Sequence, residues 1–431
     1  MKKVAFYTLG CKVNQYETEA MSELFSNSGY EICDFDGFAD IYVINTCTVT
    51  SMSDRKSRQI IRRAKKQNSD AIVIVTGCYS QTNPESVLEL DGVNLILGTK
   101  DRKNIVTLAE NTKSTDKLSF VGDIMKTHTF ENLEISHYEE RTRAFIKIQE
   151  GCNQFCSYCI IPYARGPIRS REMNDVILET EKLVNNGYTE IIYTGIHVAS
   201  YGLDTGEPKL ADLLKEANKI EGLKRIRLSS IEPMTLDEEF IKRISECDKL
   251  CHHFHLSLQS GCDETLKRMN RKYTTQEYKK IVDGLRNKYP DVAITTDIMT
   301  GFPGETDEEF SKTLDFVKEI SFADAHIFQY SQRNGTPAAK RPDQISPEVK
   351  EKRSKELIKI CKKSQDEFVS SFIGKTMEVL FEQPSKNGYF EGKTSNYITV
   401  YVKTDENLQS IYKNVYIQEV KNQIAYGIIV D

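Results

Sequence analysis

Short apolar runs alternate with stretches of helical spacing along the first hundred residues. The runs that predict strands lie at 4–9, 41–45, 71–75 and 93–97. The segments 14–28 and 54–66 between them have the spacing of amphipathic helices. Such alternation predicts an α/β domain built on a parallel sheet, expected over residues 1–112.

The same alternation resumes after a polar, weakly periodic segment, 113–140, which predicts a linker. Further apolar runs predict strands at 144–148, 190–194, 225–228, 254–258, 293–298 and 325–330. Six strand–helix units are typical of a partial (β/α)6 barrel, an opened relative of the TIM barrel. We expect this core over residues 141–367, with its site at the carboxyl ends of the strands.

The pattern changes once more after a long charged helical segment at 347–371. Short alternating segments then predict strands at 377–381, 389–391, 397–402, 415–420 and 424–430. Short strands punctuated by glycines predict a small all-β barrel of OB-like type over residues 368–431.

Composition indicates a globular, multidomain chain. Of the 431 residues, 39% are hydrophobic, and the longest apolar runs are far too short to cross a bilayer. The amino terminus lacks a secretory h-region, so we expect a cytoplasmic protein without a membrane partner. The formal net charge of −5 gives no global attraction to nucleic acid, so any RNA site must be a local patch.

Three closely spaced cysteines are the strongest chemical signal. Cys152, Cys156 and Cys159 form a C-x-x-x-C-x-x-C run, which can hold three irons of a 4Fe–4S cube and leave the fourth iron open to a small molecule. Ferredoxin spacings instead supply four cysteines. A structural zinc site is the less favoured alternative, because zinc takes four ligands and no second C-x-x-C or H-x-x-x-H motif lies nearby.

Three further cysteines occupy equivalent positions in the amino-terminal pattern. Cys11, Cys47 and Cys78 each follow the carboxyl end of a predicted strand. In a parallel sheet these ends share one edge, so we expect the three thiols to converge, and three thiolates again suggest a cluster with an open iron. The alternative is that each is a small buried hydrophobe.

For the remaining candidates, a structural role is favoured over a functional one. The residues 251–255 read Cys-His-His-Phe-His, but their alternation favours packing within a barrel strand over a metal site. The basic helix at 54–66 is interpreted as a solvated face, and a patch that binds the RNA backbone is the alternative. The cysteines without placed partners are expected to be structural: Cys33, Cys247, Cys262 and Cys361.

The cysteine run with an aromatic residue, Tyr158, before its last cysteine resembles the signature of the radical S-adenosylmethionine (SAM) superfamily. The resemblance implies that SAM binds the open iron and is cleaved to a 5′-deoxyadenosyl radical. It also implies that SAM is contacted by Tyr158 and by residues at strand ends, which are Gly195, Ser230, Gln259 and Asp297.

The order of the three parts resembles the methylthiotransferase family along essentially the whole chain. The family's stretches recur as Gly10-Cys11-Lys12-Val13-Asn14 and, at 301–306, as Gly-Phe-Pro-Gly-Glu-Thr. The resemblance implies two 4Fe–4S clusters, the auxiliary one on Cys11, Cys47 and Cys78, with a C-terminal RNA-binding TRAM domain. It implies SAM as methyl donor and radical source, no side-chain radical, an electron donor such as flavodoxin or ferredoxin, and a sulfur donor.

The substrate branch is indicated by Lys12-Val13, which resembles the branch that methylthiolates C2 of threonylcarbamoyl-adenosine, 3′ of the anticodon in tRNA. Branches acting on isopentenyl-adenosine tRNA or on an aspartate of a ribosomal protein are alternatives, as is a non-catalytic iron–sulfur RNA-binding protein. Arg165, Arg169 and Arg171 are expected to hold the substrate carboxylate or a phosphate, with ordinary ion pairing as the alternative.

Overall fold

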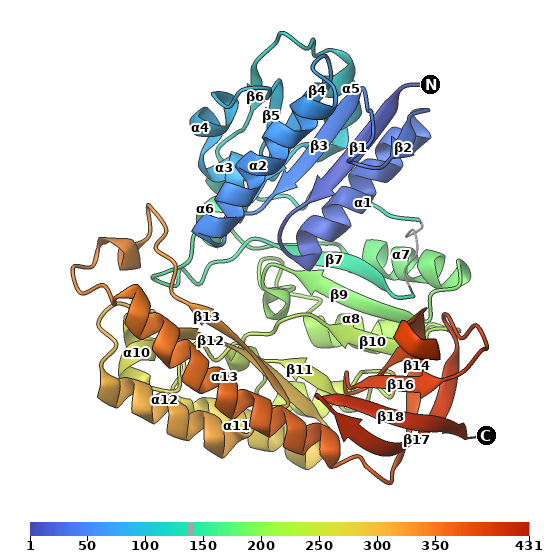
Figure 1. Cartoon of the computed structure of the whole chain (residues 1–431), viewed down its shortest axis with the longest axis vertical. Helices are drawn as coiled ribbons and strands as arrows, with labels where there is room; N and C mark the ends of the chain where they lie inside the picture. The colour runs from blue at the N-terminus through green and yellow to red at the C-terminus, as the bar shows by residue number, and fades with distance from the viewer. Residues whose placement is uncertain (137–141, 431) are drawn as a thin grey trace.

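A six-stranded parallel sheet forms the amino-terminal part of the structure, a computed structural model that describes residues 1–136 and 142–430 (Figure 1). Its strands, in the spatial order β2-β1-β3-β4-β5-β6, are β1 (Lys3–Thr8), β2 (Glu31–Cys33), β3 (Ile41–Thr46), β4 (Ile72–Gly77), β5 (Leu95–Leu97) and β6 (Leu118–Phe120). The helices are α1 (Lys12–Asn27), α2 (Ser51–Gln67), α3 (Cys78–Thr82), α4 (Pro84–Leu88) and α5 (Ile105–Glu110). Strand β3 is buried along its whole length, as is typical of a parallel strand covered on both faces.

The predicted α/β domain is confirmed, but its sheet extends further than the sequence pattern indicates. Strand β6 lies within 113–140, the segment expected to be an irregular linker, and pairs with β5. It has only three residues, of which Ser119 and Phe120 are exposed, so no apolar run marks it. Leu133 and Ile135 of the same segment are buried in the main core cluster.

The core contains the predicted six parallel strands of an open barrel. They are β7 (Ala144–Glu150), β9 (Glu190–Gly195), β10 (Arg225–Leu228), β11 (His253–His255), β12 (Ala293–Thr300) and β13 (Asp324–Gln329). Two sheets, β10-β9-β7-β8 and β11-β12-β13, are joined by isolated bridges from Ile226 to Leu250 and from Ile231 to Leu256. The short β8 (Arg169–Ser170) pairs antiparallel with the carboxyl end of β7.

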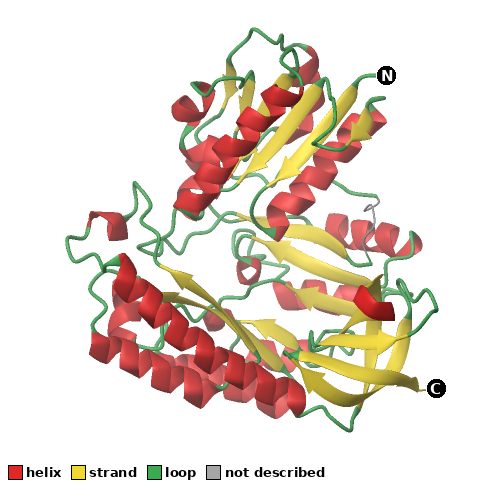
Figure 2. Ribbon diagram, viewed as in Figure 1, coloured by secondary structure: helices red, strands yellow, loops and turns green. Residues whose placement is uncertain are grey.

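Helices cover the outer side of this barrel (Figure 2). They are α7 (Met173–Asn185), α8 (Leu210–Asn218), α9 (Glu238–Ile244), α10 (Asp263–Arg268), α11 (Thr275–Lys288), α12 (Asp307–Ile320) and α13 (Pro347–Ser370). The short α6 (Ile161–Arg165) lies instead beside α3 of the amino-terminal domain. Along β7, Ala144, Ile146 and Ile148 belong to the main core cluster, while the alternate residues Lys147 and Gln149 face away from it. At these two positions the side of β7 that faces away from the core cluster is therefore polar.

The last part of the chain is a closed five-stranded barrel, as predicted. Its strands, in the order β14-β15-β16-β18-β17, are β14 (Thr376–Pro384), β15 (Tyr389–Thr394), β16 (Thr399–Lys403), β17 (Tyr412–Lys421) and β18 (Ile424–Val430). It docks on the core through Arg225 and Arg227 of β10, which donate hydrogen bonds to backbone carbonyls of Lys393 and Ser395 at 3.0 Å. No helix in the described part of the chain is long and apolar enough to cross a membrane.

Candidate functional site

Three cysteines meet at the carboxyl edge of the amino-terminal sheet. Cys11 follows β1, Cys47 follows β3 and Cys78 follows β4, and these three strands are neighbours in the sheet. Gly10 and Gly77, with φ of 107° and 97°, make the left-handed turns that residues with a side chain rarely adopt. A Cβ on Gly10 would lie 3.1 Å from the sulfur of Cys47, so a residue with a side chain would crowd that sulfur. We call this set the auxiliary triad.

The other three cysteines lie in the loop that follows β7 and form the core triad. The backbone N–H of Cys159 donates to the carbonyl of Cys156 at 2.9 Å, which folds the loop into a tight turn. Ser157 anchors the loop to the segment after α10, because its N–H donates to the carbonyl of Met269 at 2.9 Å. Cys156 is buried, and Cys152 and Cys159 are half-buried.

The donor set fits iron–sulfur clusters. Burial raises the pKa of Cys78 and of Cys159 to about 12, and that of Cys152 to about 11. Metal ligation requires the thiolate, so these sulfurs ionise only when a bound metal compensates for the lost hydration. No three His, Cys, Asp or Glu side chains among residues 1–136 and 142–430 are arranged to hold a single metal ion. Each triad offers three thiols, the number that leaves one iron of a 4Fe–4S cluster open, whereas a structural zinc site takes four ligands.

Three of the residues expected to contact SAM lie at the carboxyl ends of barrel strands. Gly195 ends β9, the exposed Ser230 follows β10, and Gln259 follows β11 with φ of 67°. Asp297 lies inside β12, where its carboxylate is 3.2 Å from Nε2 of His255. A role in SAM binding stays a prediction for all four.

Tyr158 is half-buried, and its ring centroid lies 6.4 Å from that of Phe302 in an edge-to-face arrangement. Phe302 belongs to the Gly-Phe-Pro-Gly-Glu-Thr stretch, so the packing joins the core triad's loop to the turn after β12. Contact between Tyr158 and SAM is likewise a prediction.

Two residues that the sequence interpretation did not assign also belong to this region. Arg271 donates from Nη1 to Sγ of Cys156 at 3.3 Å and from Nη2 to Glu232 at 2.6 Å. Both ring nitrogens of His197 are buried and have no hydrogen-bond partner in the described part of the chain. Burial lowers the pKa of His197 to about 4, so the ring is neutral. Buried unpaired polar atoms are rare, and their presence here fits a polar ligand such as SAM.

The three arginines expected to hold the substrate are all buried and have protein partners. Arg165 pairs with Glu17 at 2.6 Å, and Arg171 pairs with Glu179. Arg169 donates to backbone carbonyls, including that of Pro167 at 2.9 Å. A substrate role stays a prediction for these residues, while the contacts of Arg165 and Arg171 are those of structural ion pairs.

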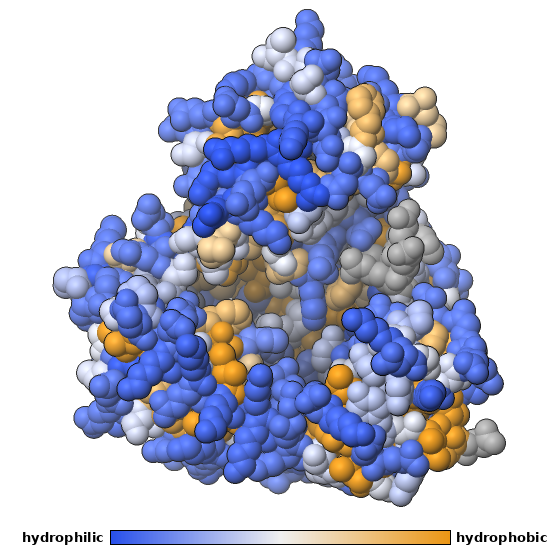
Figure 3. Space-filling model, in the orientation of Figure 1, coloured by the Kyte–Doolittle hydropathy of each residue, from blue (hydrophilic) through white to orange (hydrophobic). Residues whose placement is uncertain are grey.

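The face of the molecule in Figure 3 is hollowed between the amino-terminal domain and the core. Lys12, the first residue of α1, follows Cys11 and is half-buried. Its Nζ lies 6.0 Å from the ring centroid of Phe145, and no carboxylate of the described residues lies within ion-pairing distance. The exposed cations of α2, which are Arg55, Lys56, Arg62 and Lys66, form a separate basic face.

Comparisons with known proteins agree with this architecture. Family models match residues 3–98 ("Uncharacterized protein family UPF0004"), 146–317 ("Radical SAM superfamily") and 370–430 ("TRAM domain"). The solved structure of the radical SAM methyltransferase TsrM from Kitasatospora setae aligns with a TM-score of 0.57 at 17% identity. It covers 79% of this chain and 77% of that one, and this likeness shows the fold alone.

Curated relatives match almost the whole chain. The threonylcarbamoyladenosine tRNA methylthiotransferase MtaB of Bacillus subtilis is 44% identical over 414 residues, 95% of this chain and 92% of that protein. MtaB of Aquifex aeolicus is 39% identical, covering 92% of this chain and 96% of that protein. The tRNA-2-methylthio-N(6)-dimethylallyladenosine synthase of Alkaliphilus oremlandii is 38% identical, covering 100% and 93%.

The open barrel, its cysteine loop and the matching superfamily model define a radical SAM enzyme. The identity and coverage of the relatives then show that the chain belongs to the radical SAM methylthiotransferase family, as its motifs predict. Enzymes of this family carry two 4Fe–4S clusters and use SAM.

Proposed function

We propose that this protein methylthiolates C2 of threonylcarbamoyl-adenosine, 3′ of the anticodon in tRNA, with SAM as methyl donor and radical source. The observation that carries the proposal is the 44% identity to MtaB of Bacillus subtilis over 95% of the chain. The TRAM domain is the expected RNA-binding element. We further propose a cytoplasmic location and, as partners, an electron donor such as flavodoxin or ferredoxin and a sulfur donor.

Each group of side chains has a distinct task in this proposal. The core triad holds the SAM-binding cluster, and the auxiliary triad holds the second one. When bound, the first cluster would supply the electron that cleaves SAM, and the second would carry the sulfur that receives the methyl group. Arg271, fixed by Glu232, orients Cys156, while the neutral His197 offers hydrogen bonds to SAM.

The substrate carboxylate is assigned to Lys12. Arg165 and Arg171 pair with buried glutamates, whereas Lys12 contacts an aromatic ring and, among the described residues, has no carboxylate partner. It adjoins Cys11 of the auxiliary triad, where the sulfur must meet the base. A carboxylate would neutralise this half-buried ammonium, whereas the apolar isopentenyl tail would leave it unpaired at a desolvation cost.

Purified, reconstituted enzyme should act on tRNA bearing the threonylcarbamoyl group and much less on isopentenylated or unmodified tRNA. The physical reason is that only the first substrate offers Lys12 a charged partner. Nucleoside mass spectrometry of the three reactions measures this. Preference for the isopentenyl form would move the protein to the sister branch, and activity on a ribosomal protein alone would end the RNA-substrate proposal.

Lys12→Gln should raise KM for threonylcarbamoylated tRNA and lower kcat/KM roughly 10- to 100-fold, because a charge-assisted hydrogen bond contributes about 1.5–3 kcal/mol. The matched control is Lys113→Gln, an exposed lysine of the same domain, which should leave both constants unchanged. Steady-state kinetics with that tRNA give the comparison. Wild-type constants for Lys12→Gln would exclude Lys12 from the substrate site.

A further inference from the structure

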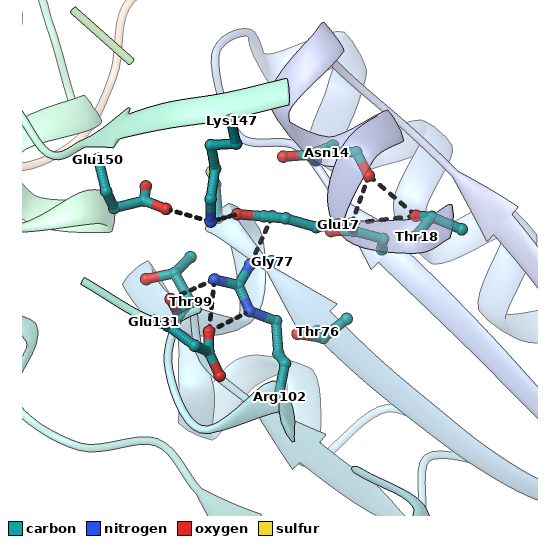
Figure 4. Close-up of polar contacts among 12 residues, drawn as sticks. Asn14, Glu17, Thr18, Thr76, Gly77, Thr99, Arg102, Glu131, Lys147 and Glu150 are labelled. Atoms are coloured by element: carbon teal, nitrogen blue, oxygen red, sulfur yellow. Dashed lines mark hydrogen bonds and ion pairs between the residues drawn. The ribbon is translucent and has the colours of Figure 1, made fainter. Parts of the chain in front are cut away.

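A buried polar network joins the amino-terminal domain to the core (Figure 4). Glu17 of α1 pairs with Lys147 of β7 at 3.0 Å and also with Arg102. Lys147 pairs with Glu150 at 2.8 Å, and Arg102 pairs with Glu131 at 2.8 Å. The side chains of Glu17 and Arg102 have no exposed surface, so the network is shielded from water.

Arg165, the last residue of α6, completes this network and uses all five of its N–H donors. Nη1 donates to Glu17 at 2.6 Å and to Glu150 at 3.0 Å. Nη2 donates to Asn14 at 2.6 Å and to the second oxygen of Glu17 at 3.1 Å. Nε donates to Sγ of Cys78 at 3.1 Å. An arginine has five such donors in a rigid fork, so none is left for a substrate.

From these contacts we infer that Arg165 is a positioning residue for the auxiliary cluster, which it controls through the sulfur of Cys78. The inference rests on the proposed assignment of Cys78 as a ligand of that cluster. Arg165 lies six positions after Cys159, so it fixes a sulfur of one triad from the segment that carries the other. It thereby sets how the two triads are placed relative to each other.

The charges of the network show why the contact with sulfur matters. Three cations, Arg165, Arg102 and Lys147, face three carboxylates, those of Glu17, Glu150 and Glu131. The carboxylates hold the guanidinium plane in place, and Nε is thereby aimed at the sulfur. Hydrogen bonds to ligand sulfurs and nearby positive charge favour the reduced form of an iron–sulfur cluster and raise its reduction potential. Loss of Arg165 should therefore lower the potential of the auxiliary cluster.

The test uses the full-length protein with Cys152, Cys156 and Cys159 replaced by alanine, so that only the auxiliary cluster is reconstituted. In this background we expect Arg165→Met to shift the midpoint potential to lower values and to change the EPR spectrum of the reduced cluster. The matched control is Arg353→Met. Arg353 is also buried and pairs with Glu305 at 2.7 Å, and none of its contacts in the described structure is to a cysteine. The control should keep the parent's potential and spectrum.

Arg165→Lys can be measured in the same way if the methionine variant does not fold. Lysine keeps a cation opposite Glu17 and Glu150 but lacks the Nε donor to Cys78, so a smaller shift in the same direction is expected. A potential and spectrum equal to those of the parent in a folded, iron-loaded Arg165 variant would overturn the inference. No tRNA enters these measurements, so a wrong substrate assignment would leave them unchanged and would show only in the tRNA assays.

Discussion

Replacing Cys152, Cys156 and Cys159 together by alanine is expected to abolish SAM cleavage and to remove about half of the iron, since one of two 4Fe–4S clusters loses all its protein ligands. The three residues lie in one loop after β7, which Ser157 ties to the barrel at Met269. The variant leaves this loop without a cysteine, so the cluster assigned to it loses all its thiolate ligands. Iron and sulfide analysis after anaerobic reconstitution, with an assay for 5′-deoxyadenosine, gives both results.

A second triple variant controls for the loss of cysteines as such. Cys33, Cys247 and Cys361 lie outside both triads, and their replacement by alanine should leave iron content and SAM cleavage near wild type. Full iron in the Cys152/Cys156/Cys159 variant would show that these residues are not the ligands. Half the iron with undiminished SAM cleavage would place SAM at the other triad.

The convergence of the auxiliary triad could be predicted because it depends on topology alone. Cys11, Cys47 and Cys78 are separated by long stretches of sequence, but each follows a strand of a parallel sheet. Such strands end at one edge, and β1, β3 and β4 prove to be neighbours. The positions of the apolar runs were therefore enough to predict that three distant residues converge, without any knowledge of side-chain contacts.

The surroundings of Arg165 could not be predicted in this way. Its position after the cysteine motif indicates a site residue, but the sequence shows no charge partner nearby. The partners Asn14, Glu17 and Cys78 come from another domain, at separations of 151, 148 and 87 residues. Only the docking of the amino-terminal domain on the core adds these partners to Glu150, the partner that the core itself supplies to Arg165.

The segment 251–255 is a second case in which the sequence predicts the strand but not its contact with another domain. Its alternation correctly indicates a barrel strand, and His253 and His255 both lie in β11. The ring of His253 is stacked on that of Tyr397 of the carboxyl-terminal barrel, with 4.9 Å between the ring centroids. Periodicity within a segment predicts which residues share a face, but it does not predict which domain packs against that face.

Cys47→Ala is expected to abolish the methylthio product while 5′-deoxyadenosine still forms. Cys47 follows β3, the middle one of the three strands that carry the auxiliary triad, and Gly10 leaves room for its sulfur. The core triad is untouched, so the two activities should separate. Tandem assays of tRNA nucleosides and of 5′-deoxyadenosine on one preparation measure both.

Cys33→Ala is the matched control for this variant. Cys33 ends β2 but pairs in register with Ala5, three residues before the end of β1, so it lies below the edge where the triad meets. This variant should keep both activities. Normal methylthiolation by Cys47→Ala would remove Cys47 from the auxiliary site, and loss of SAM cleavage as well would mean that the two triads do not work independently. Separation in Cys47→Ala alone would show that radical formation needs the core triad, whereas sulfur insertion also needs the edge of the amino-terminal sheet.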